Sequence, residues 1–249
     1  MNKIKLPLII ILHIAQMHVS EAQNSQAYST FSLNLGVNQT WTKDEFQSPY
    51  THKGLNPLIH ASYERVKKRG QHSLDLSYSS GKIKSIVSPH ANQKLITLNY
   101  DYFFNTKSRK INQRLYTSFG VGLHTFLSAT NYLPDIEQSL NNYSGNIYLT
   151  LSVCASYQLS NKSRIKMQIE LPTIGVVYRP DFEINGKTLT NISTLNDRFL
   201  ISTALGYEFR LSSKVSVTAD YRFKYFAFDE PRPLVNIQNG FSLGLKYKF

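Results

Sequence analysis

Three side chains in the first third of the chain could together make a nucleophilic site. His60 and Ser62 lie two residues apart, so on a strand both point to one face, where the imidazole could take the hydroxyl proton. A tight turn over residues 67–71 would pair the next strand so that Asp75 lies near Ser62 and within reach of His60, whose ring it would orient. This spacing is compatible with a serine hydrolase, although a histidine two residues before a serine is also frequent by chance.

Paired carboxylates offer a second catalytic hypothesis. Asp44-Glu45 and Asp229-Glu230 lie in the first and last long polar segments, which would meet if a sheet closed on itself, and His124 lies near the end of a strand. Carboxylates beside a histidine can activate water. Adjacent carboxylates on an extended backbone point in opposite directions, however, and most such pairs are solvated loop charges. We therefore expect no catalytic residue here.

The pattern gives little support for a metal or a cofactor. Of the seven histidines, two lie in the first 22 residues, and those of the remaining chain show no close ligand spacing. The single cysteine, Cys154, excludes an internal disulfide framework and a cysteine-based zinc cluster. We expect no metal and no cofactor.

The first 22 residues have the features of an export signal. Lys3 and Lys5 precede a short apolar run over residues 6–15, and residues 20–22 place small side chains at the two positions that a signal peptidase reads. Cleavage after residue 22 would leave a mature domain of residues 23–249. Export also removes the chain from nucleic acids, so we expect no nucleic-acid partner despite a net charge of +12.

Strict alternation of apolar and polar residues dominates the mature chain. A two-residue period is typical of strands with unlike faces, and no helical period of comparable length is present. No mature apolar run reaches the roughly 20 residues that a membrane-spanning helix needs. The ten alternating segments cover residues 31–37, 58–66, 73–78, 96–102, 118–124, 147–157, 165–171, 199–210, 215–224 and 241–249.

The connections between these segments alternate in length. The long polar ones cover residues 43–57, 79–93, 127–144, 179–196 and 227–237, whereas residues 67–71, 160–163 and 212–214 form tight turns and residues 105–113 are intermediate in length. Long loops at one end and short turns at the other are typical of an up-and-down antiparallel barrel of the outer-membrane type. The fold class predicted is therefore all-β: a transmembrane barrel of about ten strands, with both termini periplasmic. Pro172 marks either a bend in the seventh strand or its end, which would change the count.

A bilayer explains the alternation better than water does. A closed barrel satisfies all backbone hydrogen bonds between strands and can show apolar residues to lipid, whereas a soluble barrel reverses the two faces. Ten strands, loops that are long at one end only, and aromatic residues near strand ends, as in Tyr100-Tyr102 and at residues 223–226, favour the membrane.

The last nine residues carry the most specific pattern. They alternate apolar with small or basic residues and end on phenylalanine, which resembles the C-terminal signal that the barrel-assembly machinery recognises. The apolar members are Phe241, Leu243, Leu245, Tyr247 and Phe249. Over residues 29–249 the chain resembles the small, porin-like outer-membrane β-barrel proteins common in the Bacteroidota. That resemblance implies the outer membrane of a Gram-negative bacterium, with membrane lipid and the assembly machinery as partners, and it implies no activity.

Inward-facing charges are the candidate functional residues. Their near balance of sign predicts a network of ion pairs, since a charge buried alone is costly and a ten-stranded barrel is too narrow for a wide channel. Arg222 and Lys224 would bias a narrow pore toward anions. The predicted lumen charges are Glu64, Asp75, Asp101, Lys166, Glu170, Glu208, Arg210, Asp220, Arg222 and Lys224, with Lys246 and Lys248 on the last strand.

Three functions remain open at this point. The first is a structural or narrow porin-like barrel, and the second is a surface interaction or adhesion protein acting through loops 127–144 and 179–196. The third is an outer-membrane hydrolase. Outer-membrane lipid hydrolases carry a histidine two residues before a serine, as His60 and Ser62 are spaced here. In those enzymes the pair must reach lipid on the outer face of the barrel. Here Ile59 and Tyr63 occupy the lipid face, so His60 and Ser62 would point inward.

Overall fold

The computed structural model describes eleven strands. The described residues are 27–45, 48–67, 69–86, 91–104, 114–132, 141–180, 188–194, 198–228 and 233–249, so the export signal lies outside them. Within these ranges, no helix is long and apolar enough to cross a membrane. The strands are β1 (Tyr28–Asp44), β2 (Ser48–Val66), β3 (Gly70–Ile83), β4 (Ala91–Phe104), β5 (Leu115–Asn131), β6 (Asn141–Gln158), β7 (Ser163–Pro180), β8 (Thr188–Thr194), β9 (Arg198–Arg210), β10 (Val215–Phe228) and β11 (Leu234–Lys248).

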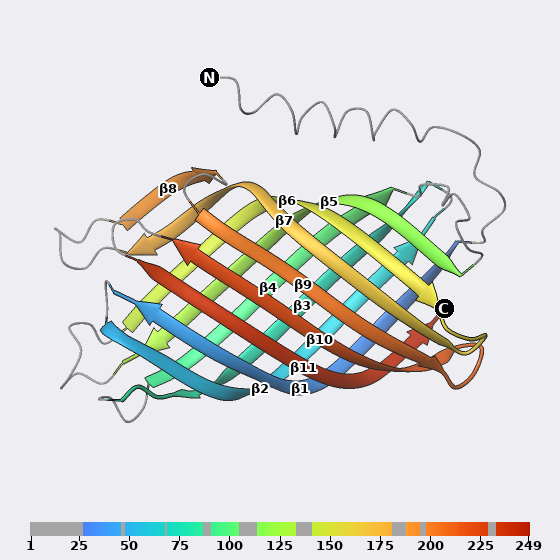
Figure 1. Ribbon diagram of the computed structural model, residues 1–249, viewed down its shortest axis with the longest axis horizontal. Helices are drawn as coiled ribbons and strands as arrows, with labels where there is room; N and C mark the ends of the chain where they lie inside the picture. Colours follow the sequence, from blue (N-terminus) through green and yellow to red (C-terminus); the bar gives the residue numbers. More distant parts are fainter. Residues whose placement is uncertain are drawn as a thin grey trace, which may run out of the picture.

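Ten of these strands close into an antiparallel barrel (Figure 1). Successive strands pair with each other, β7 pairs with β9 across the β8 segment, and β1 pairs with β11 to complete the ring. Strand β8 pairs only with β7 among the described residues, at the end of the barrel where β7 has left β9. The prediction of a closed ten-stranded barrel is therefore confirmed, with β8 as an addition to it.

The two ends of the barrel differ. Tyr28 and Phe249 lie at one end, which we call the terminal end, and there the chain reverses in tight turns closed by backbone hydrogen bonds from Lys67 to Gly70 and from Leu211 to Val215. The other end, which we call the loop end, carries β8 (Figure 1). One long connection, over residues 105–114 between β4 and β5, lies at the terminal end.

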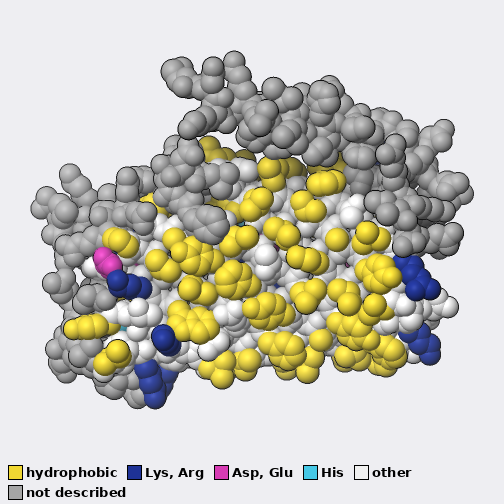
Figure 2. All heavy atoms as spheres, in the orientation of Figure 1, with side chains coloured by type: hydrophobic (Ala, Val, Ile, Leu, Met, Phe, Trp, Pro, Cys, Tyr) yellow, Lys and Arg dark blue, Asp and Glu magenta, His cyan; other side chains and the backbone are white. Residues whose placement is uncertain are grey.

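Alternation along each strand places apolar side chains outside and polar ones inside. On β1, Leu35 is 62% exposed whereas Asn34 is completely buried, and the same contrast repeats around the wall. Figure 2 shows a belt of apolar side chains around the middle of the barrel, with lysine and arginine toward its two ends. A wall with these two faces is suited to hydrocarbon outside and to a polar interior.

The long loops expected from the sequence are mostly strand. Strand β2 begins at Ser48, and β1 stays paired with β11 as far as Asp44 and Leu234. Beyond the apolar belt the outer face turns polar, as at Gln39 and Lys43, so the hydrophobic alternation fades while the backbone ladder continues. The expected loop boundaries were therefore wrong. Hydrophobic alternation marks only the part of each strand that lies in the apolar belt, whereas the strand itself continues beyond it.

Pro172 bends β7 without ending it. It pairs with Thr150, after which the register with β6 shifts by one residue, and the hydroxyl of Thr173 donates to the carbonyl of Leu149 at 3.1 Å. Such a bulge moves the following residues to the other face. Arg179 consequently points inward and is 2% exposed.

Candidate functional site

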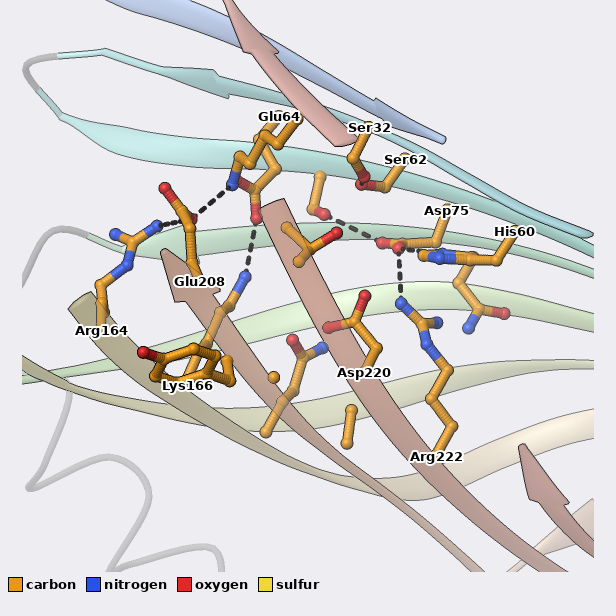
Figure 3. A pocket seen from close by; sticks show the side chains of 18 of the residues that line it. Ser32, His60, Ser62, Glu64, Asp75, Arg164, Lys166, Glu208, Asp220 and Arg222 are labelled. Carbon is orange, nitrogen blue, oxygen red and sulfur yellow. Dashed lines mark hydrogen bonds and ion pairs between the residues drawn. The ribbon is translucent and has the colours of Figure 1, made fainter. Parts of the chain in front are cut away.

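The structure places the predicted charges at several levels of the interior. Figure 3 shows one of these levels, with Glu64, Asp75 and Arg222. Arg210 differs from the others because it lies exposed at the terminal end, with Lys248. Lys224 lines two smaller cavities nearer the loop end, and Asp101 is buried beside His124. One cavity of about 90 Å³ is lined by Glu64, Asp75, Lys166, Glu170, Glu208, Asp220, Arg222 and Lys246.

Glu64 joins three strands across the lumen. Its carboxylate accepts from Lys166 on β7 at 2.7 Å and from Lys246 on β11 at 2.6 Å. Lys246 also lies 3.5 Å from Glu208, whose carboxylate accepts from Arg164 at 2.6 Å. Strands β2 and β7 are five places apart around the ten-stranded ring, so Glu64 and Lys166 meet from opposite walls.

Asp75 organises a second group beside the first. It lies 3.0 Å from the Nε2 atom of His60 and accepts from Arg222 at 3.2 Å and from Ser73 at 3.0 Å. Arg222 comes from β10, four strands away from β3 around the ring, and its guanidinium reaches across to Asp75 in Figure 3. These contacts pair partly buried charges of opposite sign.

The His60 and Ser62 pair does not form a nucleophilic triad. Asp75 does contact His60, as the strand register predicted. The second ring nitrogen of His60 lies 3.5 Å from the Asn34 amide, and the Ser62 hydroxyl hydrogen-bonds that of Ser32 at 2.6 Å. Both ring nitrogens therefore face other groups, which leaves neither to accept the Ser62 proton.

A cluster that the sequence analysis missed lies around His124. Its Nε2 atom is 3.0 Å from Asp101 and its Nδ1 atom is 3.4 Å from Glu170, and all three residues are buried. Gly122 makes room for this contact, because a Cβ atom there would overlap the Asp101 carboxylate. Asp101 pairs with Gly122 in the register of β4 and β5. A correct prediction of that register from the sequence could therefore have placed Asp101 near His124.

Charge balance favours an ion-paired imidazolium at His124 over a metal ion. The three side chains lie close enough to hold a cation. The Nε2 atom of His124 hydrogen-bonds Asp101, whereas its Nδ1 atom lies 3.4 Å from a Glu170 oxygen, a contact that pairs opposite charges when the ring is protonated but is not a hydrogen bond. Lys224 lines the same cavity as Glu170, so two carboxylates already meet two cationic groups.

This interpretation predicts that metals leave the stability unchanged. We expect EDTA, Zn²⁺ and Mn²⁺ each to change the thermal unfolding midpoint of the refolded wild-type protein in detergent no more than they change the midpoint of the His124→Asn variant. A ligand that binds only the folded state raises that midpoint. A metal-dependent increase that His124→Asn abolishes would show that the cluster is a metal site.

Of the two carboxylate pairs, the structure describes only Asp44-Glu45, and these two side chains form ion pairs with basic residues. Asp44 is buried and forms an ion pair with Arg179, and Glu45 lies 2.5 Å from Lys43. His124 was expected near the end of its strand, at the rim. That expectation was wrong, because His124 lies in the middle of β5 with its side chain buried inside the barrel. Residues 229 and 230 lie outside the described residues.

An apolar cluster lies inside the barrel toward the loop end. Val177, Phe226, Phe228 and Leu234 form a buried cluster with Leu200 packed on it, and the rings of Phe126 and Phe226 lie 6.5 Å apart. Strands β5 and β10 are four places apart around the ring, so that contact spans the lumen. Phe226 was expected at the membrane interface, but it points inward because it shares the parity of Arg222 and Lys224.

Comparison with solved structures defines the fold. The chain resembles the outer-membrane protease OmpT of Escherichia coli, with a TM-score of 0.59 and 9% identity over 92% of this chain and all of that one. The fold is that of an outer-membrane β-barrel. Neisserial surface protein A gives a TM-score of 0.40 at 12% identity, covering 88% of this chain and 97% of that chain. The translocator domain of the autotransporter NalP from Neisseria meningitidis gives 0.44 at 11%, covering 98% and 95%. The sequence matches no protein-family profile and no curated protein.

Proposed function

We propose that the protein is an integral outer-membrane β-barrel exported by residues 1–22, with residues 23–249 as its membrane domain. The outward apolar belt supports insertion, and three short turns among the four connections of the terminal end support a periplasmic position for both termini. The apolar residues of the C-terminal signal, Phe241 through Phe249, all point outward, which suits recognition by the assembly machinery.

Its role in this proposal is that of a filled, structural barrel. The observation that carries this is contact between opposite walls: Glu64 meets Lys166, Asp44 meets Arg179, and Phe126 meets Phe226. Side chains from facing strands thus close the interior at several levels, as expected for a small barrel. The cavities between the described side chains are small, measuring 30 to 120 Å³.

Conductance in a planar lipid bilayer tests this role. The refolded wild-type protein should insert and give no discrete current steps. Phe226→Ala/Phe228→Ala removes two rings of the apolar cluster and should produce steps, whereas the outward control Leu35→Ala/Leu243→Ala should stay silent. Steps from the wild-type protein would refute a closed barrel.

A narrow anion pathway is the second candidate, because adjoining cavities share lining residues. His60 and Arg222 line both the 90 Å³ cavity and one of the smaller ones, and Lys224 continues the polar lining toward the apolar cluster. Anion-selective wild-type steps whose selectivity falls in Arg222→Gln/Lys224→Gln would favour this candidate.

We propose no enzymatic activity. The interior position of His60, Ser62 and His124 and the pairing of Asp44 support this, since a hydrolase needs an accessible nucleophile or water-activating group. Adhesion through loops 127–144 and 179–196 would also involve residues 133–140, 181–187 and 195–196, which lie outside the described residues.

A further inference from the structure

The terminal mouth of the barrel contains a cavity with a strongly basic wall. It measures about 120 Å³ and lies between the starts of β1, β7 and β10 and the ends of β6, β9 and β11. Six cationic side chains line it, and we call them the basic mouth: Lys162, Arg164, Arg210, Lys214, Lys246 and Lys248.

Only one carboxylate, Glu208, lines this cavity among the described residues. It already binds Arg164 at 2.6 Å, lies 3.5 Å from Lys246 and accepts from the Ser216 hydroxyl at 3.1 Å. No carboxylate of the described residues lies within ion-pair distance of Lys162, Arg210, Lys214 or Lys248; Lys248 instead lies 4.2 Å above the Tyr28 ring. The mouth therefore carries a surplus of positive charge.

This charge distribution differs from that of the neighbouring cavity. The 90 Å³ cavity sets five carboxylates, those of Glu64, Asp75, Glu170, Glu208 and Asp220, against four cationic side chains. All four of these cations pair with a carboxylate of the same cavity, whereas four of the six cations of the mouth have no carboxylate of the described residues within ion-pair distance. A concave site rich in cationic donors and poor in acceptors attracts anions.

The chemistry of the donors selects the kind of anion. Guanidinium and ammonium groups form charge-assisted hydrogen bonds with phosphate oxygens, and Arg210 offers a planar fork that matches two of them. Tyr28 and Ser213 add hydroxyl groups to the wall, which can donate to further oxygens. Convergence of these donors suits a compact anion with several oxygens.

We propose that the basic mouth binds a phosphate oxyanion. In the proposed orientation this mouth opens to the periplasm, so the phosphate belongs either to a soluble ion or ester or to a phospholipid headgroup at the inner face of the membrane. This site is independent of whether the barrel conducts, because it lies outside the apolar cluster toward the loop end.

Calorimetric titration of the refolded full-length mature protein with inorganic phosphate tests the proposal. In neutral detergent the wild-type protein should bind phosphate saturably. Arg210→Gln/Lys214→Gln should weaken the affinity for phosphate by about tenfold or more for each cation removed. The reason is that a hydrogen bond to a charged group contributes about 1.4 kcal/mol or more, which corresponds to a tenfold or larger change in the dissociation constant. The matched control Arg65→Gln/Lys82→Gln removes two cations from the outer wall and should bind like wild type.

Nanodiscs distinguish the two sources of phosphate. If free phosphate binds and the Arg210→Gln/Lys214→Gln variant loses it, the ligand is soluble. If free phosphate gives no heat but phosphatidylglycerol, and not phosphatidylcholine, raises the unfolding midpoint of wild type and not of this variant, the ligand is a headgroup. The proposal would be overturned if Arg210→Gln/Lys214→Gln bound phosphate as well as Arg65→Gln/Lys82→Gln does, or if the wild-type protein responded in neither experiment. Heat-modifiable migration on gels verifies that the wild-type protein and both variants are folded.

Discussion

Gly36→Val is expected to prevent barrel closure. A Cβ atom at Gly36 would overlap the carbonyl oxygen of Phe241 and lie 2.6 Å from the Cα atom of Ser242. Both are backbone atoms of β11, so no rotation of a side chain relieves the overlap. Gly36 pairs with Ser242 in the seam that joins the first strand to the last, where strands must approach closely for the ring to close.

Heat-modifiable migration on gels measures this outcome. Gly36→Val should give only the unfolded band after refolding into detergent, and Gly244→Val should do the same, because its Cβ atom would overlap the carbonyl oxygen of Leu33. Gly240→Ala is the matched control on β11: its nearest neighbour is a Leu58 methyl at 3.2 Å, which can move. A fully folded Gly36→Val protein would contradict the β1–β11 register.

Glu64→Gln is expected to have the next largest effect, on stability. The change removes the charge that Lys166 and Lys246 share, and Lys166 then has no other carboxylate within ion-pair distance among the described residues. This pair is only partly buried, with side-chain exposures of 29% and 13%, so its loss should cost between the roughly 1 kcal/mol of an exposed pair and the roughly 3 kcal/mol of a buried one. Lys246 keeps its contact with Glu208, so the loss arises mainly from Lys166.

Urea unfolding in detergent, followed by the fluorescence of Trp41, the one tryptophan in the chain, gives this free energy. Glu45→Gln is the control, since it breaks a partly exposed pair with Lys43 and should change the free energy by less than about 0.5 kcal/mol. Glu64→Gln/Lys166→Gln should recover part of the lost stability. Equal effects of Glu64→Gln and Glu45→Gln would contradict a buried network.

The fold was predictable because lipid imposes a simple rule on each strand. Outward residues such as Leu33 and Leu35 had to be apolar and their neighbours polar, so the sequence predicted ten strands and the inward parity of Glu64 and Arg222. Strand ends were not predictable, because the ladder continues through Thr40 and Thr42 after the outer face has turned polar.

Contacts across the lumen were also beyond the sequence. Asp75 could be placed near His60, because a tight turn fixes the register of neighbouring strands. The contact of His124 with Glu170 and that of Glu64 with Lys166 join strands that are not neighbours, and they depend on the tilt and closure of the ring. The bulge after Pro172, which turns Arg179 inward, likewise needed the pairing of β6 with β7.

The most direct test of the central claim, a lipid-embedded barrel with a filled interior, is fluorescence quenching by lipids brominated on their acyl chains. In a Trp41→Phe background, Leu35→Trp places the fluorophore on the outer belt and Phe226→Trp places it in the apolar cluster of the interior. Brominated bilayers should quench the first strongly and leave the second almost unchanged. Equal quenching of the two, or quenching of neither, would contradict the claim.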